Sequence, residues 1–264
     1  RMHEATLVLK DIAAGGGTTE WKEKTPAPVK RKVRFPFREE RYMADLYESP
    51  EGSLAGIVLV PGVARRGKDD PRLVAFARSL ARARFAVLVP DLPSVRNLSV
   101  SPRNVDEVEA AFAWLIARPQ HAPGGIAGIA GISYAAGPAV LAAMEKTIRH
   151  DVAFVLSVGG YYDLESVLTY ATTGCYRKDG QWECTKPNTY GKWVFTYGIA
   201  TRLVAGDDIR TLQAVAERKM ANPEAKIADL TGGLSTNAQA VLRFVTNDDP
   251  GRSKRLLAKI PKAL

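Results

Sequence analysis

The spacing of apolar and polar residues changes along the chain, and each change predicts an element. Residues 33–37 and 42–47 alternate, as expected for two antiparallel strands joined by the charged turn at 38–41. Four later runs are continuously apolar, like strands that a parallel sheet buries on both faces. These runs span 56–60, 85–90, 125–132 and 152–158. Amphipathic helices are predicted between them, at 71–84, 105–117 and 134–148.

This order predicts an α/β fold, with a doubly wound, mostly parallel sheet forming a core over residues 29–163. Residues 1–28 are predicted to be an N-terminal arm, because the glycines at 15–17 and the prolines at 26 and 28 interrupt any long element. From 164 to 264 the pattern predicts a cap-like segment of helices alone, so the last strands of the sheet are expected to be absent from this chain. These helices are expected at 164–172, 191–204, 209–220, 223–230, 236–246 and 252–260.

Composition narrows the class of protein. The chain has 264 residues, 46% hydrophobic and 25% charged, which suits one sizeable hydrophobic core. Its net charge is +9, but no aromatic residues interleave the basic ones, so the charge is interpreted as solvated faces and no nucleic-acid partner is expected. Lys10 and Asp11 interrupt the apolar segment at 5–14, and no stretch approaches the roughly 18–20 residues of a membrane span. We therefore expect no integral membrane association, while the two chain ends leave processing or truncation open.

Two cysteines bracket a polar, turn-prone stretch. The spacing of Cys175 and Cys184 suits a disulfide across a small hairpin, which would imply an extracytoplasmic, oxidising compartment. Two unpaired thiols in a cytoplasmic protein are the alternative. No histidine or second cysteine pair lies nearby, so neither a metal site nor a cofactor is predicted.

The segment 131–137, Gly-Ile-Ser-Tyr-Ala-Ala-Gly, lies between an apolar strand and an alanine-rich helix. A serine nucleophile needs such a tight strand-to-helix turn, which lifts its hydroxyl clear of the carboxyl edge of the sheet. Gly131 and Ala135 are small enough to let the turn close, although the G-x-S-x-G pattern has glycine where Ala135 stands. Ser133 is therefore the candidate nucleophile; the alternative is a serine that only caps the helix.

Acyl transfer also needs donors for the negative charge that develops on the carbonyl oxygen. The elbow can supply the backbone N–H of Tyr134. The loop after the first parallel strand, Pro61-Gly62-Val63-Ala64, can supply a second N–H from Val63. The alternative interpretation of this loop is a simple turn.

Taken together, four blocks resemble a known family. They are residues 58–62, 87–93, 131–137 and 159–164. As a set they are similar to the α/β-hydrolase superfamily, specifically to bacterial carboxylesterases or dienelactone-hydrolase-like members, over about residues 29–170. The resemblance implies hydrolysis of esters or related carbonyl compounds, and it implies that the helices after 164 are an insertion that caps the pocket.

The partner base is missing from the expected place. In this superfamily a histidine after the last strand activates the serine, and a carboxylate orients that histidine. His121 and His150 each precede a strand, so both are expected at the amino edge of the sheet, as surface or helix-end residues. His3 lies in the arm. The economical explanation is that the last two strands, with their acid and histidine, lie beyond residue 264.

The acid is equally open. Asp163 follows a strand at the correct edge, but an N-cap for the next helix is its alternative role. Asp207 and Asp208 mimic the strand-then-acid segment of the family, although the residues before them are predicted to be helical and Asp208 fits an N-cap. Asp91 is interpreted as a loop or structural acid.

The sequence thus predicts a serine ester hydrolase with Ser133 as its nucleophile and a small-molecule ester as its substrate. The alternatives are a hydrolase-fold binding or interaction protein that has lost its base, and a membrane-surface lipase that uses the basic face. An aromatic group in the helical segment is expected either to line an acyl pocket or to form the core of the cap. Its members are Tyr170, Tyr176, Trp182, Tyr190, Trp193, Phe195 and Tyr197.

Overall fold

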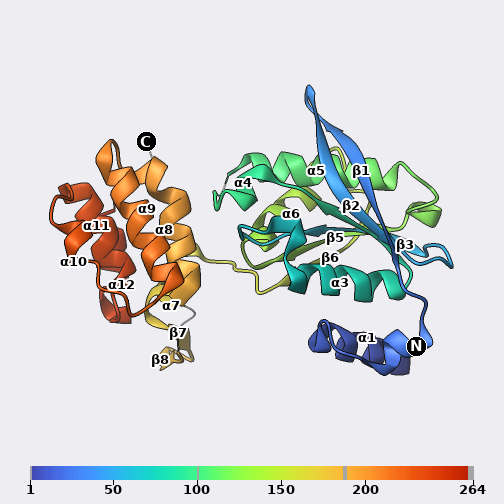
Figure 1. The fold of residues 1–264 in the computed structure, drawn as a ribbon, viewed down its shortest axis with the longest axis horizontal. Coiled ribbons are helices and arrows are strands. Elements are labelled where there is room, and N and C mark those ends of the chain that lie inside the picture. Colours follow the sequence, from blue (N-terminus) through green and yellow to red (C-terminus); the bar gives the residue numbers. More distant parts are fainter. Residues whose placement is uncertain (1, 100, 187–188, 261–264) are drawn as a thin grey trace. The chain divides into compact units, whose positions relative to one another are not determined.

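The computed structural model describes residues 2–99, 101–186 and 189–260, which divide into two compact units (Figure 1). Unit 1 contains the residues up to Arg96 together with Ser101–Gly160. Unit 2 contains the described residues of 97–100 and those from Tyr161 onward. The observed division follows Gly160, close to the boundary at 163 that the sequence predicts. None of the described helices is long and apolar enough to cross a bilayer.

Unit 1 is built on a six-stranded sheet of the predicted mostly parallel type. Its strands are β1 (Val29–Phe37), β2 (Glu40–Glu48), β3 (Ala55–Val60), β4 (Phe85–Pro90), β5 (Ala127–Ile132) and β6 (Val152–Val158). Their order across the sheet is β1-β2-β4-β3-β5-β6. β1 and β2 form the predicted antiparallel hairpin, β2 pairs antiparallel with β4, and the remaining pairs are parallel. The α/β fold class is confirmed.

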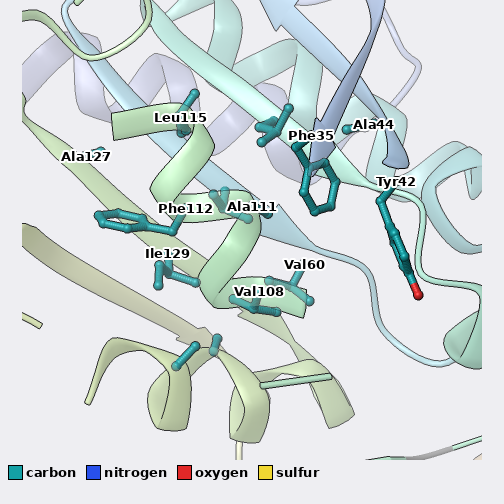
Figure 2. Packing of buried hydrophobic residues seen from close by; sticks show 14 of the residues in the cluster. Phe35, Tyr42, Ala44, Val60, Val108, Ala111, Phe112, Leu115, Ala127 and Ile129 are labelled. Atoms are coloured by element: carbon teal, nitrogen blue, oxygen red, sulfur yellow. The ribbon is translucent and has the colours of Figure 1, made fainter. Parts of the chain in front are cut away.

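Helices cover both faces of this sheet. Successive residues of β3 point to opposite faces of the sheet and are apolar on both. Ile57 and Leu59 pack on α3 (Pro71–Arg82), whereas Val58 and Val60 pack on α5 (Arg103–Ile116). Figure 2 shows the second of these layers, in which the apolar stripe of α5 meets the strands. The shorter helices of unit 1 are α4 (Pro93–Arg96) and α6 (Ala136–Ala143), and single 3-10 turns span Gly67–Asp69, Pro123–Gly125 and Ser133–Ala135. Both faces of β3 are thus buried, as its continuous apolar run predicts.

β6 lies at one end of the sheet and differs from the inner strands. Val155, Leu156 and Val158 are 41%, 38% and 42% exposed, although β6 is as apolar as β3. Among the described residues no strand pairs with its outer edge. An apolar run therefore predicts the strand correctly here but overestimates its burial.

The predicted arm at residues 1–28 contains helices. α1 (Met2–Ala14) ends before the three glycines, and α2 (Glu20–Lys24) ends before the prolines. Asp11, which is fully buried in α1, accepts a 2.6 Å hydrogen bond from Ser79 of α3. The glycines and prolines therefore limit the length of helices here without preventing them.

Two predicted helices are shorter than expected by four residues or more. The helix expected at 134–148 ends at Ala143, because consecutive turns bring Ile148 back into the core, where it is 3% exposed. The helix expected at 223–230 is reduced to α10 (Ala228–Thr231), because the Asn222 side chain accepts the N–H of Glu224 and closes a turn instead.

Unit 2 has its own core, formed by helices near the predicted positions. They are α7 (Leu164–Thr173), α8 (Thr189–Leu203), α9 (Asp207–Ala221), α11 (Thr236–Val245) and α12 (Pro250–Leu257), in addition to α10. The expectation of helices alone is wrong, since β7 (Cys175–Lys178) and β8 (Gln181–Cys184) form a hairpin. Cys175 faces Cys184 across it and the two form a disulfide. The hairpin that the cysteine spacing suggests is therefore present.

Candidate active site

Ser133 stands at the strand-to-helix turn that follows β5. Its side chain is exposed, and its backbone φ is +56°, a left-handed conformation that residues other than glycine rarely adopt. The 3-10 turn Ser133–Ala135 then leads into α6. A serine at this position points its hydroxyl away from the packed sheet at the carboxyl end of β5, as a nucleophile requires.

Two glycines let this turn close. A Cβ on Gly131 would lie 2.4 Å from the carbonyl oxygen of Ala135, so any side chain there would collide with backbone. A Cβ on Gly62 would lie 3.0 Å from the Ile132 oxygen and 3.7 Å from the Ser133 Cβ. The loop after β3 therefore runs directly beside the serine, where the sequence places the second oxyanion donor.

The backbone N–H groups of Tyr134 and Val63 remain predicted donors for an oxyanion. Both residues are partly buried and flank the serine, one in the 3-10 turn and one next to Gly62. The far end of the same loop is fixed by a buried ion pair, in which Lys68 Nζ lies 3.0 Å from Asp45 Oδ2. Burial lowers the pKa of Lys68, but hydrogen bonds to Asp69 and Asp45 outweigh it and the net pKa is raised. Lys68 is therefore a charged anchor and not a base.

The Tyr134 side chain joins a buried polar network that the sequence analysis missed. Its hydroxyl lies 3.2 Å from Asn104 Oδ1 and 3.2 Å from the backbone N of Ser101. Asn104 in turn donates to Glu107, which also accepts a 3.1 Å hydrogen bond from Tyr42. Burial, reinforced by the charge of Glu107, raises the pKa of Tyr42, so its phenol stays a donor.

The three histidines lie in other parts of unit 1 and have other surroundings. His121 Nδ1 lies 2.6 Å from Glu48 Oε1, and its carbonyl is next to Gly56 at the start of β3, so it lies at the amino edge as predicted. It is 7% exposed, however, and the expectation of a surface or helix-end residue is wrong because Trp114 stacks on it. His150 is exposed before β6, and His3 is exposed in α1.

The candidate acids have structural partners. Asp163 caps α7 and accepts the N–H groups of Glu165 and Ser166. Its pKa is lowered, first by the hydrogen bond from the Ser166 side chain and then by these backbone N–H groups. Asp207 pairs with Arg210. Asp208 is not an N-cap, because Gly206 occupies that position; its carboxylate accepts hydrogen bonds from Ser235 instead. All three of these residues belong to unit 2, whereas Ser133 belongs to unit 1.

Asp91 remains a loop acid, 3.0 Å from Arg96. Within residues 2–99, 101–186 and 189–260 no group of three His, Cys, Asp or Glu side chains is arranged to hold a metal ion. In the aromatic group of unit 2, Trp193 is buried in the core, with Phe195 and Tyr197 packed against it. The other four members are exposed: Tyr170, Tyr176, Trp182 and Tyr190.

Several solved structures are similar to part of the chain. A dienelactone hydrolase from Anabaena variabilis is 23% identical over 50% of this chain and 63% of its own, with a TM-score of 0.41. A dienelactone hydrolase-like promiscuous phosphotriesterase from metagenomic libraries is 16% identical over 50% and 59%, with a TM-score of 0.39. A hyperthermophilic esterase from the archaeon Pyrobaculum calidifontis is 17% identical over 66% and 56%, with a TM-score of 0.46.

The chain thus spans only 56–63% of the length of these three structures. The solved structures similar to this chain are thus dienelactone-hydrolase-like proteins and esterases, as the sequence resemblance implies. The α/β architecture follows from the strand order of the chain itself. No family model and no curated protein matches the chain.

Proposed function

We propose that this chain is a serine hydrolase that cleaves small carboxylic esters through an acyl-enzyme on Ser133. One observation carries the proposal: an exposed serine with φ of +56° at the carboxyl end of a central strand, with the Gly62 loop against its backbone. A serine that served only as a helix cap would not need this conformation, because N-caps have extended backbone.

In the proposed reaction Ser133 Oγ attacks the ester carbonyl. The N–H groups of Tyr134 and Val63 donate hydrogen bonds to the oxyanion, which can stabilise the transition state by about 3 kcal/mol for each donor. The alcohol leaves with a proton, and water then attacks the acyl-enzyme to release the acid and free Ser133. A base must accept the serine proton in the first step.

That base is unassigned among the described residues, since His121 lies at the amino edge of the sheet and pairs with Glu48. A missing base typically lowers turnover by a factor on the order of 10⁴ to 10⁶. The proposal therefore predicts slow acylation in residues 1–264 alone, and a test must detect single modification events and not turnover.

The test is covalent labelling with a fluorophosphonate at high reagent concentration, followed by peptide mapping. We expect an adduct on Ser133, absent from Ser133→Ala. Ser157, an exposed serine of β6 in regular strand conformation, is the matched control: Ser157→Ala should leave the adduct unchanged. A folded sample in which Ser133 reacts no faster than Ser157 contradicts the proposal.

A second candidate is a non-catalytic binding protein with a hydrolase fold, favoured by the position of His121. It predicts that ligands bind equally well to the wild type and to Ser133→Ala and that no product forms. Isothermal titration of both proteins with ester and with the corresponding acid separates the two functions.

We also infer an extracytoplasmic, oxidising compartment, which is supported by the disulfide between Cys175 and Cys184. Intact mass after alkylation without reduction tests it on protein isolated from its native source. Two alkylated thiols would favour the cytoplasmic alternative.

A further inference from the structure

The Tyr134 phenol is held in the polar network at the start of α5. Its oxygen accepts the N–H of Ser101 and donates to Asn104 Oδ1, each at 3.2 Å. Tyr134 follows Ser133 directly, so its side chain ties the strained turn to another element.

Asn104 is the centre of this network and is 1% exposed. Its Nδ2 lies 2.7 Å from Glu107 Oε2 and 2.7 Å from Ser94 Oγ. A carboxylate only accepts hydrogen bonds, so the NH₂ group must face Glu107 and the Oδ1 atom must face Tyr134. The backbone N–H of Ser101 lies 3.2 Å from the same Oδ1 and requires the same orientation. The amide of Asn104 can therefore adopt only one of its two orientations.

Glu107 fixes Asn104 in turn. This carboxylate is 2% exposed and accepts a hydrogen bond from Tyr42 of β2, and Arg103 Nε lies 3.4 Å from its Oε1. Asn104 is thus linked directly to α4 through Ser94 and indirectly to β2 through Glu107. A left-handed, non-glycine residue costs about 1–3 kcal/mol and persists only where its surroundings determine it. The network supplies such a constraint one residue from Ser133.

We propose that Asn104 is a positioning residue of the nucleophile elbow, which acts through the Tyr134 hydroxyl to fix the turn at Ser133 and the direction of the Tyr134 N–H. This inference rests on the proposed function for its chemical consequence. It assigns Asn104 no contact with substrate.

The test compares fluorophosphonate labelling of Ser133 in the wild type, Tyr134→Phe, Asn104→Ala and the double variant. We expect each single variant to lower the saturating labelling rate about tenfold, the value of one buried hydrogen bond, with the half-saturating reagent concentration unchanged. The double variant should be no slower than Asn104→Ala, because both changes remove the same link. Ser157→Ala is the matched control; it removes a serine hydroxyl of β6 outside this network and should label like the wild type.

A structural readout runs in parallel, in case Asn104→Ala fails to fold. The three-bond HN–Hα coupling of Ser133 reports its φ, and the amide ¹⁵N shift of Tyr134 reports the direction of its N–H. Both should change in Tyr134→Phe, which keeps the aromatic ring, and stay constant in Ser157→Ala. Unchanged couplings and labelling rates in Tyr134→Phe overturn the inference while leaving the proposed function intact. A wild type without any Ser133 adduct overturns the proposed function, and the coupling then decides the positioning role alone.

Discussion

Ser133 has a left-handed backbone conformation, which is unfavourable for a residue with a side chain. A Cβ in the left-handed region costs about 1–2 kcal/mol, whereas glycine adopts this region freely. The φ of +56° therefore indicates that stability is given up at this residue, which is common where a side chain must be presented for function.

Replacement of Ser133 tests that cost. We predict that Ser133→Gly is more stable than Ser133→Ala by about 0.5–1 kcal/mol, because the relief of strain exceeds the extra entropy of glycine in the unfolded chain. Both variants lose the hydroxyl, so only the backbone differs between them. Urea unfolding of the two proteins measures the difference, and an alanine variant of equal or greater stability would contradict the left-handed assignment.

At the scale of elements, α1 depends on one buried carboxylate. Asp11 accepts hydrogen bonds from Ser79 and Thr19 and lies 3.1 Å from Lys22 Nζ. Burial alone raises the pKa of Asp11, but these partners outweigh it and the net pKa is lowered. At neutral pH the charged form of Asp11 is therefore more stable in the folded protein than in the unfolded chain. Asp11 should hold α1 to α3 chiefly when it is charged.

This shift sets a pH dependence. A carboxyl group with a lowered folded pKa stabilises the protein fully above its unfolded pKa, about 3.9, and loses that contribution as pH falls through the folded value. We predict that Asp11→Asn destabilises α1 by about 1–2 kcal/mol at pH 7 and that the difference from wild type shrinks below about pH 4. Hydrogen exchange of the α1 amides measures it.

The control is Glu20→Gln, which removes an exposed pair with Lys24 and should change little. A difference between Asp11→Asn and wild type that stays constant down to pH 2 would mean that the charge of Asp11 is not what holds α1.

The same elements show what the sequence can predict. β4 and β6 are found at the predicted residues because a strand of a parallel sheet has a local sequence pattern, a continuous apolar run. The packing of α1 on α3 has no such local pattern, since Asp11 and Ser79 are 68 residues apart in the sequence. Ser133 could be found because the elbow is a local motif.

The network around Tyr134 was missed, although a signal existed. Val108, Ala111, Phe112 and Leu115 form the buried stripe of α5, and Asn104 and Glu107 continue it by one turn. Polar residues within an apolar stripe indicate buried hydrogen bonds. Their partner Tyr134 could not be predicted, because it comes from a turn 30 residues away.

At the scale of the whole molecule, the chain contains two independent sets of buried residues. The core clusters of unit 1 contain residues up to Phe154, whereas the cluster of unit 2 runs from Val167 to Ile260. Each cluster buries its apolar side chains within its own unit, which is the condition for separate cooperative unfolding.

The disulfide gives a way to test this separation, because it lies in unit 2 only. Cys175 and Cys184 are 9 positions apart in the sequence, and closing this loop restricts the unfolded chain and stabilises the folded state by about 2–3 kcal/mol. We predict two transitions in calorimetry, of which dithiothreitol lowers only one, the one that hydrogen exchange assigns to residues 161–260. The double variant Cys175→Ser, Cys184→Ser should show the lowered transition without reductant and no further response to it. A single transition that shifts as a whole would show that the two cores unfold together, and the hairpin would then stabilise the sheet of unit 1 as much as its own helices.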